Sequence, residues 1–178
     1  MILTDQEILV NMEKGLIKVE PFDLSKLGTN SYDVHLGKTL ALYNSEILDA
    51  KSHNTITTFE IPPEGYVLTP SRFYLGVTVE YTETLAHVPF LEGKSSVGRL
   101  GIDIHATAGK GDVGFCNHWT LEISVKQPVR VYAGMPIGQL IYFVVKGDVN
   151  NFYNKKLSAK YNEKKSIPVE SMMFKNKF

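Results

Sequence analysis

Two stretches of the chain, RFYLGVTVEY at residues 72–81 and WTLEISV at residues 119–125, are rich in β-branched and aromatic residues, a composition typical of β-strands. Six further runs of this kind lie on either side of them, separated by turn-forming residues. These runs are SYDVHLG (31–37), KTLALYN (38–44), TITTFEI (55–61), GYVLTP (65–70), VRVYAG (129–134) and QLIYFVV (139–145). The connections are too short for crossover helices, so we expect mostly antiparallel sheets in a sandwich, jelly roll or closed barrel.

Neither end of the chain shows the strand pattern. Thr4 followed by Glu7 forms a capping box, apolar residues then recur at helical spacing, and Gly15 offers a stop, so a short N-terminal helix is expected. The Lys-rich segment 150–178 loses the strand pattern. We expect residues 1–178 to form one domain in which this segment orders when an anion binds.

Charge and composition exclude several classes of protein. The chain has 19 Lys and Arg against 19 Asp and Glu, and one Cys, which argues against a basic nucleic-acid-coating protein and a disulfide-stapled miniprotein. The charges are unevenly distributed along the chain. Residues 146–178 contain eight Lys and three acidic residues and carry a net charge of +5, so residues 1–145 carry a net charge of −5. Asp5, Glu7 and Glu13 stand where a signal peptide needs an uninterrupted apolar segment, and the longest apolar run, 140–145, is too short to span a membrane. A cytoplasmic protein without a membrane partner is therefore expected.

Glycines gather where we expect the chemistry. Six of the 14 lie between Gly93 and Gly114, a density that indicates tight turns or backbone close to a ligand. Within this region GKSSVGRLG (93–101) places Lys94, two hydroxyls and Arg99 between glycines, in the manner of a phosphate cradle. Arg99 could return to the face of Ser95 if the segment forms one helical turn. The alternative is a polar turn with a basic residue on each side.

A candidate acid–base group lies in the strand predicted at 119–125. Alternation sends Leu121, Ile123 and Val125 to one face and Glu122, with its polar neighbours, to the other. A carboxylate in a semi-enclosed polar pocket can act on a water molecule first as general base and then as acid. The alternative is a solvated Glu on an exposed strand face.

Four motifs, in this order, resemble one known family. They are GKSSVGRLG, TAGKGDVGF (107–115), TLEI (120–123) and AGMPIGQLIYF (133–143), and SYDVHLG and YNKKLSAKY (153–161) resemble its flanking blocks. The chain is similar to the dCTP deaminase family of the dUTPase-like superfamily. The resemblance implies a distorted antiparallel β-barrel or jelly roll with a few short helices. It also implies a homotrimer with active sites at subunit interfaces and no nucleic-acid partner.

The resemblance also implies a substrate and a reaction: a dCTP molecule carrying Mg²⁺ on its triphosphate is deaminated to dUTP. Glu122 would be the general base, and Ser95, Arg99 and Asp112 would complete the catalytic set. The nucleotide-binding residues it implies are Lys94, Ser95, Ser96, Val97, Gly98, Arg99, Thr107, Ala108, Asp112, Thr120, Leu121, Glu122, Gln139, Tyr153, Lys160 and Lys164. The sequence itself favours a route without zinc, because the PCxxC pair of nucleobase deaminases is absent.

Two other functions stay open at the level of sequence. Gly109 in the TAG form resembles members that also hydrolyse dUTP to dUMP and pyrophosphate, a step in which the aspartate matching Asp112 would serve. A non-catalytic nucleotide-binding regulator is the rival from another class, and inhibition by dTTP is also open. Asn117 stands where many members have glycine, which predicts a different turn before the catalytic strand, and Lys164 stands where Gln is common.

The remaining chemistry-bearing residues are expected to be structural. Cys116 is interpreted as a small packed side chain, and Trp119 as part of the core or of a subunit interface. The histidines, among them His105 and His118, show no metal-ligand spacing and are expected to be hydrogen-bonded or exposed.

Overall fold

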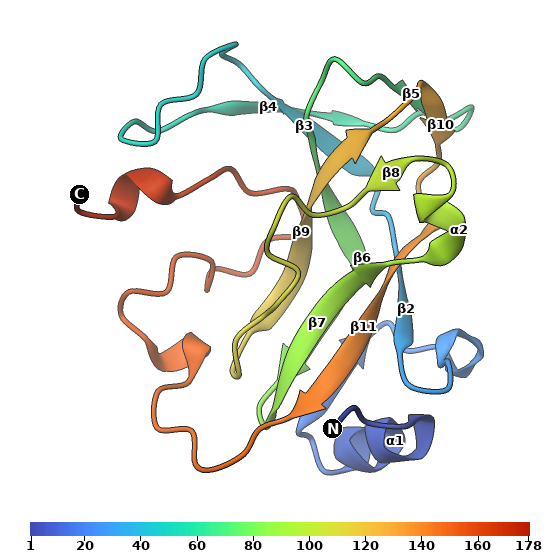
Figure 1. Cartoon of the computed structure of the whole chain (residues 1–178), viewed down its shortest axis with the longest axis vertical. Coiled ribbons are helices and arrows are strands. Elements are labelled where there is room, and N and C mark those ends of the chain that lie inside the picture. Colours follow the sequence, from blue (N-terminus) through green and yellow to red (C-terminus); the bar gives the residue numbers. More distant parts are fainter.

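The computed structural model describes residues 1–178 and consists mainly of β-strands (Figure 1). The strands are β1 (Ile17–Glu20), β2 (Tyr32–His35), β3 (Thr39–Tyr43), β4 (Ile56–Glu60), β5 (Tyr66–Leu68), β6 (Tyr74–Thr84), β7 (His87–Gly93), β8 (Ile102–Asp103), β9 (Cys116–Val125), β10 (Val129–Val131) and β11 (Pro136–Val144). The helices are α1 (Asp5–Glu13) and α2 (Ser95–Gly98), with 3₁₀ turns at Leu24–Lys26, Tyr153–Lys155 and Met173–Lys175.

All paired strands run antiparallel, as predicted. The largest sheet has the order β4-β3-β6-β9-β8, with β1 also pairing with β6, and a second sheet has the order β2-β11-β7. The short pair β10-β5 forms a third. Buried side chains from both larger sheets, such as Leu121 of β9 and Leu140 of β11, belong to one hydrophobic cluster. The sheets therefore share a single core, as in a sandwich or barrel.

The eight strands predicted from sequence are all present, and the N-terminal helix is confirmed. Thr4 caps α1 by accepting a hydrogen bond from the N–H of Glu7 at 3.4 Å. Gly15 has φ of 69°, a left-handed conformation that ends the helix at low cost because glycine has no Cβ.

Three strands, β1, β7 and β8, were not predicted from the sequence. β1 and β8 are too short to show a pattern, and β7 contains Pro89, which argues against a strand. The structure resolves the conflict, because β7 ends the three-stranded sheet and needs partners only from β11 on one side. On its other side the Pro89 carbonyl accepts a hydrogen bond from Gly111 at 2.8 Å.

β9 connects the core to a polar face. Its burial alternates residue by residue, and Trp119, Leu121 and Ile123 are buried on the core side. Glu122 and Thr120 lie on the other side, as predicted. β9 begins three residues earlier than the predicted run, so Asn117 lies inside the strand, opposite Thr82 of β6, and not in a preceding turn. Asn117 is therefore a strand residue, and its effect on the shape of the turn before the strand stays a prediction.

From Asn150 onward the chain contains no strand, and this C-terminal tail runs beside β9 (Figure 1). It is attached by hydrogen bonds to side chains of the sheet, such as the Val169 N–H to Thr120 Oγ1 at 3.2 Å. No helix has both the length and the apolar character that a membrane crossing requires.

Candidate active site

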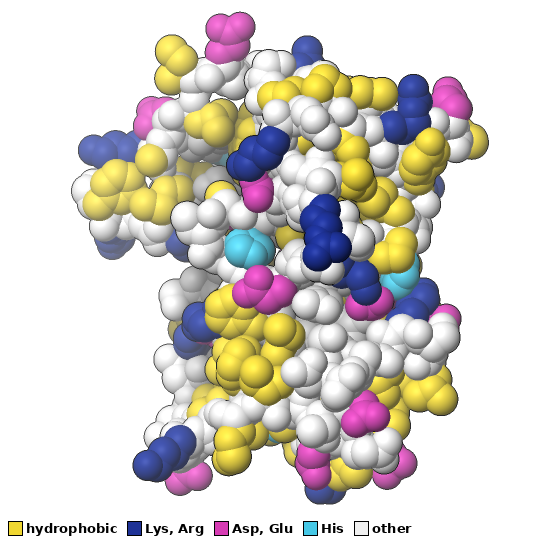
Figure 2. Space-filling model, turned by 45° about the vertical axis from the view of Figure 1, so that its right-hand side comes forward, with side chains coloured by type: hydrophobic (Ala, Val, Ile, Leu, Met, Phe, Trp, Pro, Cys, Tyr) yellow, Lys and Arg dark blue, Asp and Glu magenta, His cyan; other side chains and the backbone are white.

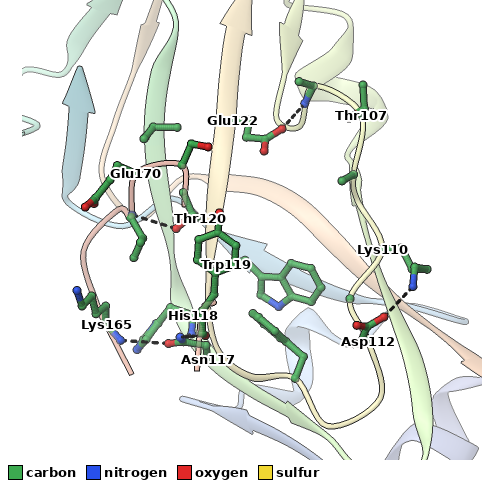
Figure 3. A pocket seen from close by; sticks show the side chains of 18 of the residues that line it. Thr107, Lys110, Asp112, Asn117, His118, Trp119, Thr120, Glu122, Lys165 and Glu170 are labelled. Carbon is green, nitrogen blue, oxygen red and sulfur yellow. Dashed lines mark hydrogen bonds and ion pairs between the residues drawn. The ribbon is translucent and has the colours of Figure 1, made fainter. Parts of the chain in front are cut away.

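A cavity of about 510 Å³ lies against the polar side of β9 (Figure 3). The loop between β8 and β9 forms one wall, and the tail forms another. Apolar side chains of β3 and β6 complete it. Its lining includes Tyr43, Phe73, Leu75, Ala106, Thr107, Ala108, Lys110, Asp112, Asn117, His118, Trp119, Thr120, Glu122, Tyr153, Lys165, Val169, Glu170 and Ser171.

Glu122 projects into this cavity because its neighbours in β9 are committed to the core. Leu121 and Ile123 are both 0% exposed, which fixes the strand's rotation. The Glu122 N–H donates to the Ile104 carbonyl at 2.9 Å, and its Oε2 accepts from the Ala106 N–H at 2.8 Å (Figure 3). The carboxylate is thus held in one direction, with its second oxygen free of any hydrogen-bond partner in the chain. This is the geometry that a general base acting on water requires.

Asp112 lies across the cavity on the loop, between two lysines. Its Oδ1 accepts from Lys110 Nζ at 2.9 Å, and its Oδ2 from Lys156 Nζ of the tail at 3.5 Å. The hydrogen bond from Lys110 is the main reason that the pKa of Asp112 lies below its ordinary value, although partial burial opposes it. Asp112 is therefore a charged carboxylate at neutral pH.

The predicted phosphate cradle is a single helical turn. The Arg99 N–H donates to the Ser95 carbonyl at 3.0 Å, which confirms the predicted turn. Lys94 precedes the turn, and its ammonium group pairs with the Asp33 carboxylate of β2. Gln139 of β11 lies opposite Asp33 in the same sheet and accepts a hydrogen bond from Ser31 Oγ at 3.3 Å.

The cradle lies apart from the cavity within one chain. None of residues 94–99 lines it, and α2 lies on the right of Figure 1 while the tail lies on the left. Figure 2 gives a view turned toward the α2 side, where Lys and Arg side chains are interspersed with Asp and Glu and form no single basic patch.

The predicted nucleotide-binding residues therefore divide into two groups. Those that line the cavity are Thr107, Ala108, Asp112, Thr120, Glu122 and Tyr153. Those that do not are Lys94, Ser95, Ser96, Val97, Gly98, Arg99, Leu121, Gln139, Lys160 and Lys164. Leu121 in particular is fully buried in the core, where its side chain cannot contact a nucleotide in the cavity.

The two tail lysines that the resemblance named, Lys160 and Lys164, do not line this cavity in one chain. Lys160 Nζ donates to Asn176 Oδ1 at 2.6 Å, and Lys164 Nζ lies 4.1 Å from the centre of the Tyr81 ring. Lys165 lines the cavity instead. Nothing in the sequence separates Lys165 from the other tail lysines, because its position depends on where the tail crosses β9.

Several other cavity residues were missed by the sequence analysis. Tyr43 and Phe73 come from strands or turns that carry no motif, and Glu170 and Ser171 come from the end of the tail. His118 was noted only as a histidine without metal-ligand spacing, and its Nδ1 lies 3.1 Å from the Thr78 carbonyl. Only the folded chain brings these residues together.

The remaining expectations are confirmed with one exception. Trp119 is 7% exposed, belongs to the core cluster and donates from Nε1 to Thr82 Oγ1 at 2.9 Å. Cys116 is half-buried, and burial raises the pKa of its thiol. The exception concerns His87 and His105, whose Nδ1 atoms are buried without a hydrogen-bond partner.

The chemistry of the cavity bears on the expected magnesium ion. No group of three or more His, Cys, Asp and Glu side chains that could hold a metal occurs in the chain. Asp112 already accepts hydrogen bonds from two lysines, and Glu122 stands on another element. Neither carboxylate therefore belongs to a cluster of protein ligands for a metal ion, and the magnesium ion on the triphosphate stays a prediction.

Comparisons with known proteins identify the family of this chain and agree with its fold. A family model described as dCTP deaminase-like matches residues 2–145. A Clostridium acetobutylicum protein named "dCTP deaminase, dUMP-forming" is 46% identical over 176 residues, which cover 99% of this chain and 98% of that protein. A Leptospira biflexa protein of the same name is 48% identical over 159 residues, which cover 89% and 91%.

A solved structure extends the comparison to three dimensions. The crystal structure of 2′-deoxycytidine 5′-triphosphate deaminase from Agrobacterium tumefaciens superimposes with a TM-score of 0.64 at 21% identity, over 81% of this chain and 48% of that one. At this identity the match shows the fold alone, which is dUTPase-like and mostly β, as expected. The family model and the relatives that match nearly the whole chain show that it belongs to the dCTP deaminase-like family of hydrolases.

Proposed function

We propose that the protein deaminates dCTP and hydrolyses the product further, so that dCTP and two water molecules yield dUMP, ammonia and pyrophosphate. The carrying observation is the Glu122 carboxylate, oriented into the cavity by the Ala106 N–H. The relatives that match nearly the whole chain are named for the dUMP-forming reaction, which favours this two-step activity over simple deamination to dUTP.

In the deamination step Glu122 takes a proton from a water molecule as the water oxygen attacks C4 of cytosine. A tetrahedral intermediate forms, and protons returned through Glu122 convert the amino group into leaving ammonia. The backbone of Thr107 and Ala108, on the loop facing Glu122, is in place to contact the pyrimidine. Thr120, beside Glu122 on the same strand face, already accepts a tail hydrogen bond and so links base binding to the tail.

Asp112 is assigned to the sugar side of the nucleotide and to the diphosphatase step. Its charge at neutral pH lets it accept a hydrogen bond from a deoxyribose hydroxyl or from a water directed at the phosphates. Lys110 and Lys156 hold this carboxylate in place.

The active unit in this proposal is a homotrimer. The cavity of one chain lacks the Lys94–Arg99 segment, and the Lys94 to Arg99 turn lies on another face of the same chain. A neighbouring copy that brings its own turn to this cavity would supply Ser95 and Arg99 to the triphosphate. Mg²⁺ would arrive on the triphosphate and neutralise part of its charge, and dTTP would compete for the same site.

The test is to incubate the protein with dCTP, dUTP and dCMP, each with Mg²⁺, and to separate the products. The proposal expects dUMP and pyrophosphate from dCTP and from dUTP, ammonia from dCTP, and no reaction of dCMP. Accumulation of dUTP without dUMP would support the deamination step and contradict the diphosphatase step. Nucleotide binding without any product would favour the non-catalytic regulator.

A further inference from the structure

Asn117 contacts the tail more extensively than any other side chain of the sheet. Its Nδ2 donates to the carbonyls of Tyr161 at 3.0 Å and Glu163 at 2.8 Å. Its Oδ1 accepts from the N–H of Lys165 at 3.1 Å and from that of His118 at 2.9 Å. An amide side chain has two donor hydrogens and two acceptor lone pairs, so every one is used.

Because this amide is buried, losing its hydrogen bonds would destabilise the protein. Asn117 is 4% exposed, and a buried polar group left without partners is costly. The tail main chain can therefore not slide along β9 without breaking three hydrogen bonds at once. The other attachments, from Thr120 to the Val169 N–H and from Tyr43 to the Ser171 N–H, each hold one amide.

This register decides which lysine faces the cavity. Lys165, whose N–H is bound by Asn117, lines the cavity, whereas Lys164 lies over the Tyr81 ring. A shift of the tail by one residue would bring Lys164 into the place of Lys165 and move Lys165 away from it. In the observed register the only ion-pair partner of Lys165 is Glu163 at 3.3 Å, and the Glu163 side chain is 76% exposed. Such a solvated pair is weak, so Lys165 can exchange it for an anionic ligand.

We propose that Asn117 is a positioning residue for nucleotide binding, which fixes the tail so that the Lys165 ammonium group meets the anionic part of the nucleotide. The proposal rests on the proposed function for the identity of the nucleotide. It assigns a phosphate contact to Lys165, which the family resemblance did not name.

The first experiment follows the tail directly and needs no activity. Asn117→Asp keeps the size of the side chain but replaces the two donor hydrogens with an oxygen facing the carbonyls of Tyr161 and Glu163. Hydrogen exchange of the peptide covering residues 161–165 should accelerate about tenfold or more. Asn162→Asp is the matched control: the same chemical change in the same tail, at an exposed side chain that makes one hydrogen bond, to the Tyr153 carbonyl at 3.3 Å. It should change the exchange less than about twofold.

A second variant keeps the test interpretable if the buried charge of Asn117→Asp prevents folding. Asn117→Ala removes all four hydrogen bonds without adding a charge and should accelerate exchange in the same peptide. Wild-type exchange in a folded Asn117→Ala protein would overturn the role of Asn117.

The second experiment measures dCTP affinity by calorimetry in a Glu122→Gln background, which prevents turnover. Lys165→Met should weaken dCTP binding about tenfold, and Asn117→Asp by a similar factor, while Lys164→Met changes it less than about threefold. In the protein with Glu122 intact, these losses should appear in KM more than in kcat. A larger loss from Lys164→Met than from Lys165→Met would overturn the assignment.

The two experiments separate the two proposals. If the wild-type protein neither binds nor converts dCTP, the proposed function is wrong and the role in nucleotide binding is lost with it. The exchange experiment then still decides whether Asn117 holds the tail. If dCTP is converted normally and exchange of the tail is unaffected by both Asn117 variants, only the positioning role is wrong.

Discussion

The Glu122 carboxylate and the Ala106 backbone N–H are joined by a hydrogen bond of 2.8 Å that ties β9 to the loop across the cavity. A charged acceptor makes this bond stronger than a neutral one. It holds one carboxylate oxygen and leaves the other directed at the space where a substrate would lie. The relationship couples the position of the loop to the direction of the proposed base.

Glu122→Gln should abolish deamination while preserving this coupling, because the amide oxygen can still accept from Ala106. We expect ammonia release to fall by about a hundredfold or more, the usual contribution of a general base. Release is measured in a coupled assay with dCTP and Mg²⁺. Glu64→Gln, in the turn between β4 and β5, is the control and should keep wild-type rates. A Glu122→Gln enzyme with full activity would show that another group is the base.

Mixing two inactive variants tests whether neighbouring chains share a site. Arg99→Ala and Glu122→Gln proteins are each expected to be inactive. After random exchange of subunits in equal amounts, about a quarter of the sites would combine an intact Glu122 with an intact Arg99 from a neighbour. Activity should return to about that fraction of the wild-type rate. No recovery, in a mixture shown by mass spectrometry to contain mixed assemblies, would place Arg99 and Glu122 of one chain in the same site.

Removal of the Lys110 ammonium group should raise the pKa of Asp112. The hydrogen bond from Lys110 lowers that pKa from the ordinary value of 3.8, with a smaller contribution from Lys156. A carboxyl group with a lowered pKa in the folded state stabilises the fold above its unfolded pKa, and this contribution is lost as the pH falls through the folded value. We expect Lys110→Met to reduce stability at neutral pH, only slightly because the pair is half-exposed, and to make Asp112 titrate at higher pH.

The titration of Asp112 is followed by NMR of its carboxyl carbon. Lys38→Met is the control, because Lys38 pairs with the exposed Glu60 and not with Asp112. An unchanged Asp112 titration in Lys110→Met would contradict the assignment of Lys110 as the main cause.

Gly109→Ala should destabilise the fold. A Cβ at this position would lie 2.5 Å from the carbonyl oxygen of Leu91. The two residues are also joined by a hydrogen bond of 2.7 Å from the Leu91 N–H to the Gly109 carbonyl. Relief of the clash must move β7 or the loop, at a cost of about 1–3 kcal/mol. Urea unfolding measures the change, and Gly98→Ala is the control, because a Cβ there meets nothing within 4 Å. Packing thus requires glycine at position 109, independently of any role of this residue in dUTP hydrolysis.

The strands and the orientation of Glu122 were predictable because each depends on local pattern. Strict alternation in β9 identified both the buried Leu121 and the outward Glu122 from sequence alone. β7 was not predictable, because Pro89 is acceptable only at a sheet edge, and edge position is a property of the whole sheet.

The site was only half predictable for a related reason. Motif matching found Glu122 and Asp112 on two elements that meet, but it did not say which motif residues line the cavity of one chain and which, like the Lys94–Arg99 turn, lie on another face. It named Lys160 and Lys164 and not Lys165, the tail lysine that lines the cavity, since one residue of register in a segment without regular structure leaves no trace in the sequence. The Lys165 N–H is bound by Asn117, a residue that the sequence singled out only as a departure from the family pattern.

The tail is attached to the sheet mainly through its own main chain. Asn117, Thr120 and Tyr43 bind peptide N–H and C=O groups of residues 161–171, so most of these contacts do not depend on which side chains the tail carries. Selection can therefore act unequally on the two partners. The tail is free to accumulate substitutions and to tune its charge to a different ligand, whereas a change at any of the three receiving side chains removes a main-chain attachment.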